Sequence, residues 1–155
     1  MYSPAALDDM MEMKGTLRLL LTDEYGVVKE DRTIENIVTT VGKGNIASRM
    51  VGVATAVIGW MGVGTNNVAA AITDTALGAE ILVTAAHKPV TSWLASNAIC
   101  TAIATFAAGE ATGALTEAGL FNASTAGSMM CRTVFSVINK AAGDSLTITW
   151  TVTVG

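Results

Sequence analysis

The sequence is poor in charged residues, and this shortage limits its partners. Only 14% of its 155 residues are charged, against roughly 25% in a typical soluble domain. The formal net charge is −4, and no basic cluster is present. A protein of this kind attracts the phosphate backbone weakly, so we expect no direct contact with nucleic acid.

The few acidic residues are concentrated near the start of the chain. Eight of the thirteen lie at or before Glu35, which leaves the following 120 positions nearly neutral. Charge keeps free monomers in solution, so a neutral body with positive mean hydropathy favours a surface covered by copies of itself or by partners. The alternative is an ordinary Thr-rich β-protein.

The sequence also lacks a long apolar run. The segment 51–63 is apolar, but it is interrupted by glycine and is shorter than the roughly 18 residues of a membrane span. The first residues show no basic region followed by an apolar core, so we expect no signal peptide and a cytosol-like compartment. We therefore expect no membrane partner.

Residues suited to catalysis or metal binding are scarce. His87 is the only histidine, and its neighbours Lys88 and Pro89 predict a surface loop. Cys100 and Cys131 are too far apart for a metal or redox motif, and each lies in an apolar run that predicts a buried thiol. We expect no enzymatic activity, no metal site and no cofactor.

Two further patterns are too weak to indicate a site. The segment GVGTNN at 62–67 lacks the third glycine of a dinucleotide fingerprint and the Gly-Lys-Ser/Thr of a nucleotide-triphosphate loop. Nothing fixes the distance between Glu110 and Glu117, so they are not a predicted catalytic pair. Instead, we expect Glu117 to pair with a basic residue such as Arg132, or to accept hydrogen bonds from backbone N–H groups.

The clearest pattern present is the alternation of the final segment, SLTITWTVTVG. As a strand it places apolar and hydroxyl side chains on opposite faces. The apolar face holds Leu146, Ile148, Trp150, Val152 and Val154, and the other holds Ser145, Thr147, Thr149, Thr151 and Thr153. We expect this Thr-rich side to meet another sheet or another subunit; the alternative is that it faces only water.

The first half of the chain predicts a mixture of elements. Residues 15–36 predict a hairpin with its turn at 23–26. Residues 36–53 predict a helix from their mixed helical spacing, although Gly42 and Gly44 interrupt it. Residues 57–63 predict a buried strand. Thr73 or Asp74 could cap a short helix over 76–81.

The second half predicts strands separated by turns. Strand-like runs occupy 92–106, 114–121 and 128–137 before the closing strand, and residues typical of turns separate them. The fold class is therefore mainly β, an antiparallel sandwich or jelly roll with one or two short helices. We expect one domain over 15–155 preceded by an extended N-terminal arm over 1–14.

The arm combines apolar and acidic side chains. Flexible Met side chains adapt to irregular surfaces, so the arm could dock on a neighbour. A frayed terminus with one helical turn is the alternative. The candidate docking residues are Tyr2, Leu7, Met10, Met11 and Met13.

The chain after Gly15 resembles a group of small virion proteins of tailed bacteriophages. The resemblance is carried by a Thr-Glu-x-Gly-Leu-Phe segment, a Gly turn, an Arg-containing strand, an Asn-Lys-x-x-Gly-Asp turn and a Thr-alternating strand. The matching residues are Thr116, Glu117, Gly119, Leu120, Phe121, Gly127, Arg132, Asn139, Lys140, Gly143, Asp144 and the strand 146–154. The segments NIASRM, WMGVGT and TDTAL are similar to that group as well.

The resemblance implies a structural protein of the virion, assembled in the host cytoplasm. We expect a capsid cement or decoration protein that forms a homo-oligomer and bridges subunits of the major capsid protein. The alternatives are a tail, neck or baseplate protein of the same fold, and a glycan-binding module that recognises the host. The Thr-rich side of the last strand would then meet a sister subunit or the shell.

Overall fold

The structure is a computed structural model, and it describes residues 12–155. Most of the predicted arm, including the candidate docking residues Tyr2, Leu7, Met10 and Met11, lies outside the described residues. Met13 lies inside them, in the first strand.

The described part of the chain is mainly β, as the sequence predicts. Ten strands form one antiparallel sheet in the order β4-β3-β8-β9-β2-β1-β10-β7-β6, with β5 paired to β3. The elements are β1 (Met13–Thr22), β2 (Val28–Val38), α1 (Thr40–Met50), β3 (Trp60–Gly64), β4 (Glu80–Ile81), β5 (Lys88–Pro89), β6 (Ser92–Ser96), β7 (Ile99–Phe106), β8 (Gly113–Phe121), β9 (Met129–Lys140) and β10 (Ser145–Val154).

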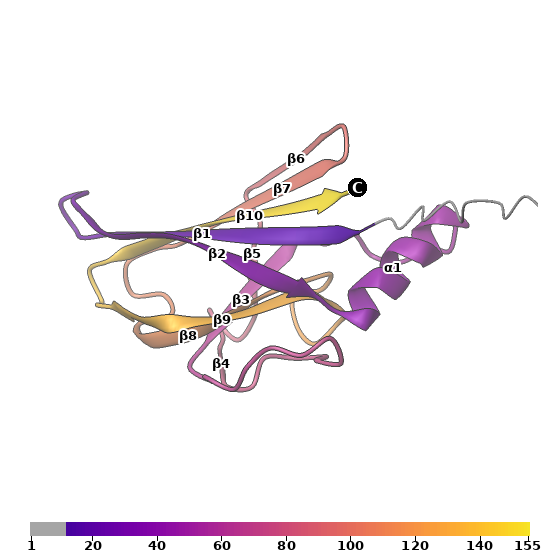
Figure 1. The fold of residues 1–155 in the computed structure, drawn as a ribbon. Helices are drawn as coiled ribbons and strands as arrows, with labels where there is room; N and C mark the ends of the chain where they lie inside the picture. Colours follow the sequence, from indigo (N-terminus) through magenta and orange to yellow (C-terminus); the bar gives the residue numbers. More distant parts are fainter. Residues whose placement is uncertain (1–11) are drawn as a thin grey trace, which may run out of the picture.

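The sheet curls so that its two halves face each other across one hydrophobic core. Figure 1 shows β1, β10, β7 and β6 in one layer and β3, β8 and β9 in the other. Strand β2 joins the layers, because it pairs with β1 along its length and with β9 through Ile37 and Val38. The arrangement is sandwich-like, but one continuous sheet supplies both layers.

Strict alternation in the strands builds the core. Apart from Met13 and Val154 at one end, the inward side chains of β1 and β10 are fully or almost fully buried. Strand β7 adds small side chains and Phe106 in register with them. Trp150 lies at the centre, where its indole N–H donates a hydrogen bond to Asn36 Oδ1 at 2.9 Å. The buried hydrophobic residues of these three strands are Leu17, Leu19, Leu21, Ala102, Ala104, Phe106, Leu146, Ile148, Trp150 and Val152.

A single helix, α1, closes one end of the described part of the molecule and packs on β9 (Figure 1). Thr39 caps it: its hydroxyl accepts a hydrogen bond from the Gly42 N–H at 2.9 Å and donates to the Met129 carbonyl at 2.6 Å. Gly42 is the buried residue of the helix, because any side chain there would meet the backbone of Met130. Gly44 faces open space.

The predicted hairpin over 15–36 is present, with the Asp23 carboxylate accepting hydrogen bonds from the N–H groups of Tyr25 and Val27 in the turn. The run predicted over 92–106 is two strands, β6 and β7, joined by a turn in which Asn97 has a positive φ of 53°. Asparagine tolerates this left-handed conformation better than most residues do.

The predicted short helix over 76–81 is wrong. Residues 75–79 form no helix, and Glu80 and Ile81 form β4. The backbone N–H groups of Gly78 and Ala79 donate instead to the buried carboxylate of Glu117. A tertiary contact of this kind outweighs a local preference for helix.

The two glycines of α1 provide a matched test of the contact between the helix and β9. Gly42→Ala would place its methyl group 2.5 Å from the Met130 carbonyl oxygen, so we expect it to lower the free energy of unfolding by about 1–3 kcal/mol. Gly44→Ala, in an exposed helical position, should raise the free energy of unfolding by about 0.5–1 kcal/mol. Urea denaturation measures both, and equal effects of the two substitutions would contradict the packing described.

Candidate functional site

The outer side of the curled sheet carries a surface rich in threonine, which we call the Thr face. It is formed by Thr16, Thr33, Thr101, Thr105, Thr147, Thr149, Thr151 and Thr153. In register across the strands, Thr151 lies between Thr16 and Thr101, and Thr149 lies between Arg18 and Ile103. The side chains are half-buried or exposed, whereas their alternating neighbours on β10 form the core. The face is therefore open to a partner.

The Thr face has little unbalanced charge near its centre. Arg18 donates two hydrogen bonds to the Asp31 carboxylate, at 2.9 and 2.7 Å, and this guanidinium holds the pKa of Asp31 below its usual value. The hydroxyl groups of Thr105 and Thr147 lie 3.0 Å apart and share a hydrogen bond. The surface offers methyl groups and hydroxyl groups together, which suits contacts with low desolvation cost.

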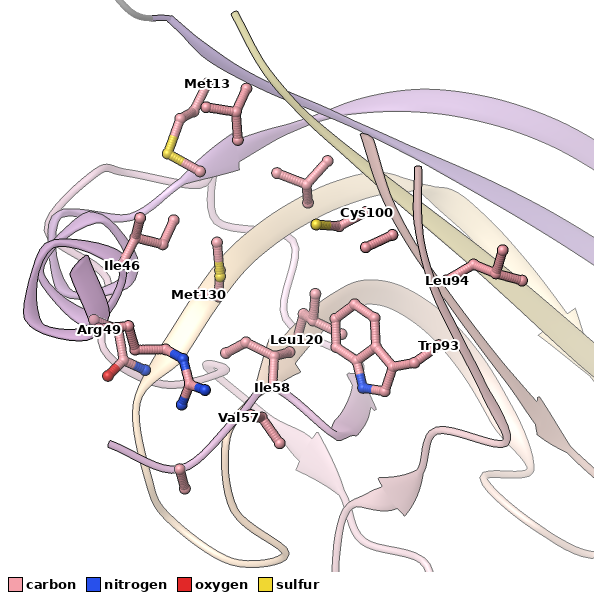
Figure 2. Close-up of a pocket in the computed structure, with 15 residues that line it drawn as sticks. Met13, Ile46, Arg49, Val57, Ile58, Trp93, Leu94, Cys100, Leu120 and Met130 are labelled. Atoms are coloured by element: carbon pink, nitrogen blue, oxygen red, sulfur yellow. The ribbon is translucent and has the colours of Figure 1, made fainter. Parts of the chain in front are cut away.

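A second surface, the apolar groove, opens at the end of the core near α1. Its volume is about 650 Å³. Figure 2 shows Ile46, Ile58, Trp93, Leu120 and Met130 turned toward this space from α1, the segment before β3, β6, β8 and β9. The remaining lining residues are Met13, Asn45, Arg49, Ala56, Val57, Leu94, Ala95, Cys100, Val152 and Val154.

The groove accounts for two residues that the sequence singles out. Met13, a candidate docking residue, lines it. Cys100 also lines it and is only half-buried, whereas burial raises the pKa of the Cys131 thiol to about 12. The prediction of a buried thiol therefore describes Cys131, and Cys100 is more accessible than predicted.

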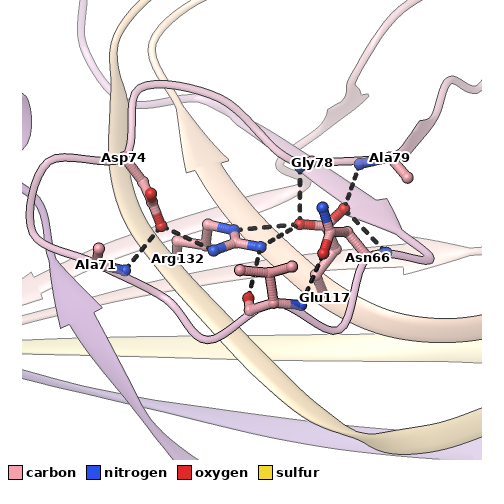
Figure 3. Close-up of polar contacts among 8 residues, drawn as sticks. Asn66, Ala71, Asp74, Gly78, Ala79, Glu117 and Arg132 are labelled. Carbon is pink, nitrogen blue, oxygen red and sulfur yellow. Dashed lines mark hydrogen bonds and ion pairs between the residues drawn. The ribbon is translucent and has the colours of Figure 1, made fainter.

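The structure brings the candidate structural pair together in a buried ion network (Figure 3). Arg132 donates to one oxygen of Glu117 through Nε at 3.1 Å and through an Nη at 2.9 Å. Its other Nη donates to Asp74 at 2.7 Å. Burial opposes the charge on Arg132, but the two carboxylates outweigh it and raise the pKa of the guanidinium.

Glu117 also fixes the backbone of the loop that leads into β4. Its side chain is fully buried and accepts hydrogen bonds from the N–H groups of Asn66, Gly78 and Ala79, at 3.3, 3.0 and 2.7 Å. The irregular segment 65–79 is therefore held against β8 and β9 by this carboxylate, together with Arg132, which donates to the Val68 carbonyl and to Asp74. Both roles considered for Glu117 from the sequence, ion pair and backbone acceptor, are present.

Asp74 is the member of this network that the sequence did not predict as an ion-pair residue. It accepts a hydrogen bond from the Ala71 N–H at 2.8 Å, and this bond, together with Arg132, lowers the pKa of Asp74. The sequence predicted it as a helix cap. A carboxylate accepts hydrogen bonds from nearby backbone N–H groups both in a helix cap and in a turn. The spacing of the sequence therefore could not reveal the ion pair between Asp74 and Arg132.

The prediction that His87 is a surface residue is wrong. Its side chain is 2% exposed and stacks on Phe121, with ring centroids 3.9 Å apart. Nδ1 lies 2.7 Å from the Ala123 carbonyl oxygen, and Nε2 lies 2.7 Å from Glu80 Oε1. A carbonyl oxygen only accepts, so Nδ1 donates to it, and one further proton must lie between Nε2 and Glu80.

A buried lysine also stabilises the turn before the last strand. Lys140 is buried and donates to the carbonyl groups of Ala107 and Asp144, at 2.9 and 2.6 Å. The Asp144 carboxylate accepts from the Ala141 N–H and from Lys29. Asp144 is thus the turn residue that the sequence predicts, and Lys140 holds the same turn from inside.

The predicted assembly residues lie on two different surfaces. Thr147, Thr149, Thr151 and Thr153 are on the Thr face, while Met13 lies in the apolar groove, on the opposite side of the same sheet. Sequence reasoning missed the groove. The available signal was the apolar segment 50–58, which leaves Met50, Val51 and Val57 exposed.

Within residues 12–155, no group of three or more His, Cys, Asp or Glu side chains is arranged to hold a metal ion. In the same residues, no helix has the length and apolar character that crossing a membrane requires.

Known proteins give no family assignment. Comparisons with protein-family profiles, curated proteins and solved structures found no match.

Loss of the Glu117 carboxylate should be among the most damaging changes to the fold. Glu117→Gln leaves Arg132 buried with one charged partner fewer, so we expect the free energy of unfolding to fall by roughly 3–5 kcal/mol. Asp31→Asn, which breaks the exposed pair with Arg18, should change it little. Urea denaturation compares the two, and a Glu117→Gln loss as small as that of Asp31→Asn would contradict the role of the network.

The His87–Glu80 contact predicts a pH dependence. Burial, with a smaller contribution from Glu117, raises the pKa of Glu80 above 4.5, although His87 opposes the shift. The stability linked to the protonation of Glu80 is therefore complete below pH 4.5 and is lost as the pH rises through the raised pKa. The Glu80→Gln variant keeps an N–H that can donate to Nε2 of His87 at every pH. The free energy of unfolding of this variant, relative to that of the original protein, should therefore increase with pH.

Glu110→Gln is the control of opposite sign. Lys88 lowers the pKa of Glu110, so the stability from this carboxylate is present above pH 4.5 and is lost as the pH falls. Urea denaturation between about pH 4 and 8 measures both profiles. Parallel curves for Glu80→Gln and the original protein would show that folding does not raise the pKa of Glu80.

Proposed function

We propose that this chain is a structural protein of a tailed-bacteriophage virion, acting as a capsid cement or decoration protein that bridges subunits of the major capsid protein. The observation that carries the proposal is the Thr face, an open sheet surface with paired charges and regularly spaced hydroxyl groups. The resemblance of residues 116–154 to virion proteins supplies the identity of the partner.

The chemistry of the Thr face supports adhesion to a protein surface. Each threonine offers a methyl group for packing and a hydroxyl group that can donate and accept hydrogen bonds. Such a face loses less on desolvation than a face of ionised side chains. About 800 Å² buried per partner is enough for a specific interface, and many copies on one particle add avidity.

The buried ionic groups support a rigid scaffold in this proposal. Glu117, Arg132 and Asp74 hold an irregular segment, and Lys140 holds the turn before β10. Each of these charged groups is hydrogen-bonded to other groups of the same chain. We assign no reaction to any of them. The function proposed here needs a fixed surface and a partner.

Counting copies per particle tests this function. Quantitative mass spectrometry of purified virions should find this chain at a copy number close to that of the major capsid protein. A few copies per particle would instead favour a tail, neck or baseplate protein, and absence from virions would overturn the proposal. Binding of the isolated protein to a glycan array, without incorporation, would favour a host-recognition module.

Charge placed on the Thr face should prevent incorporation without unfolding the protein. Thr149→Glu combined with Thr151→Glu introduces two carboxylates that must be desolvated on docking. We expect at least a roughly tenfold loss of incorporation into particles, with an unchanged far-UV circular dichroism spectrum. Thr125→Glu, in an exposed loop away from this face, is the matched control and should incorporate normally.

A further inference from the structure

The apolar groove has no role in the proposed function. We propose that it receives residues 1–11 of a second copy of this chain. The inference rests on the proposed function in one respect, because a protein that acts as a homo-oligomer needs a contact between its copies.

The position of the groove brings it close to the start of the described chain. Met13 forms part of its wall, so the described chain begins at the edge of the groove. Opposite Met13, the wall is formed by α1 and by the segment 56–58. A docked segment would therefore lie between β1 and β10 on one side and α1 on the other.

The composition of the segment matches the lining. Tyr2, Leu7, Met10 and Met11 are apolar or largely so, and unbranched Met side chains adapt to an irregular wall. The groove wall is apolar as well, with the indole of Trp93, aliphatic side chains such as Ile58 and the thioether of Met130. Its volume of about 650 Å³ accommodates several such side chains.

The charges of the groove and of the segment 1–11 favour one orientation of the docked segment. Among the described residues, Arg49 is the one charged residue that lines the groove, and Figure 2 shows its guanidinium beside Ile58 and below α1. The segment 1–11 carries Asp8 and Asp9 between its apolar residues, and it carries no Lys or Arg. A docked segment could thus place its apolar residues in the groove and an acidic side chain near Arg49.

The direction of β1 favours the segment of another molecule. Glu12 still exchanges two backbone hydrogen bonds with Gly155, at 3.2 and 2.9 Å, so the chain enters β1 in the extended direction of the ladder with β10. To fill the groove of its own molecule, the segment would have to reverse within a few residues of Glu12. A segment supplied by a second copy is free of this constraint.

Disulfide trapping tests the contact in the full-length protein. Cys100 lies in the groove, and the high pKa and burial of Cys131 keep that thiol unreactive. We expect Leu7→Cys to form a disulfide with Cys100 of another molecule under mild oxidation, and to give a covalent dimer on a non-reducing gel. Adding Cys100→Ser should abolish the dimer.

Isotope mixing identifies which molecule supplies the segment. In an oxidised mixture of ¹⁴N- and ¹⁵N-labelled Leu7→Cys protein, mass spectrometry should find disulfide-linked peptides that combine the two labels, one peptide containing the substituted position and the other containing Cys100. Linked peptides with only matched labels would show that the segment docks in its own molecule, and would overturn the proposal. Absence of any linked peptide would overturn it as well.

A charge exchange gives a second test that does not depend on oxidation. Arg49→Glu should lower the dimer fraction at least roughly fivefold in analytical ultracentrifugation, and combining it with Asp8→Lys and Asp9→Lys should restore it. Val57→Glu in the groove should also dissociate the dimer, whereas Val137→Glu, at an exposed apolar position outside the groove, should not. A monomeric original protein, or one whose dimer ignores these changes, would contradict the proposal.

These experiments use only the purified protein. The contact between copies can therefore fail while the chain is still found on virions. Equally, the contact can be present in a protein that virions do not contain. Dimerisation of the purified protein tests the contact between copies, and incorporation into virions tests the proposed function.

Discussion

Alternation of side chains along β1, β10 and β7 is the constraint on which the rest of the structure depends. A shift of register by one residue would exchange every apolar side chain of a strand with its hydroxyl neighbours. Because Leu17 pairs with Trp150 and Trp150 with Ala102, the large indole is opposite a leucine on one side and a small residue on the other. The same register that packs the core places Thr151 beside Thr16 and Thr101 on the outside.

The irregular parts of the chain depend on a different interaction, which is buried charge. Glu117 and Arg132 come from the paired strands β8 and β9, and both reach across to the segment 65–79. Such pairs contribute little net stability over apolar residues of the same size, but they specify one arrangement because a misplaced partner leaves a charge unsatisfied. In this molecule they fix the position of a loop rich in small residues, in which Leu77 is the half-buried large apolar side chain.

The strands could be predicted because their patterns are local, and the contacts between distant segments could not. The closing strand and the first hairpin follow from period-two alternation and turn residues alone. His87 was misplaced because its burial depends on Phe121 and Glu80, and residues 76–81 because Glu117 captures their backbone. The groove was missed because β1, α1, β6 and β9 each supply only part of its wall. For Glu117 and Arg132, complementary charge in neighbouring strands was enough to suggest a pair.

We propose that this protein acts through surfaces that a partner covers, with the Thr face directed at a viral shell. Hydroxyl-radical footprinting of Leu20, Ile99 and Ile103, the aliphatic residues in register with its threonines, measures that covering directly in the free protein and in purified particles. We predict that the three side chains are oxidised in the free protein and protected on the particle. Equal oxidation in both states, with the protein present on the particle, would contradict this assignment.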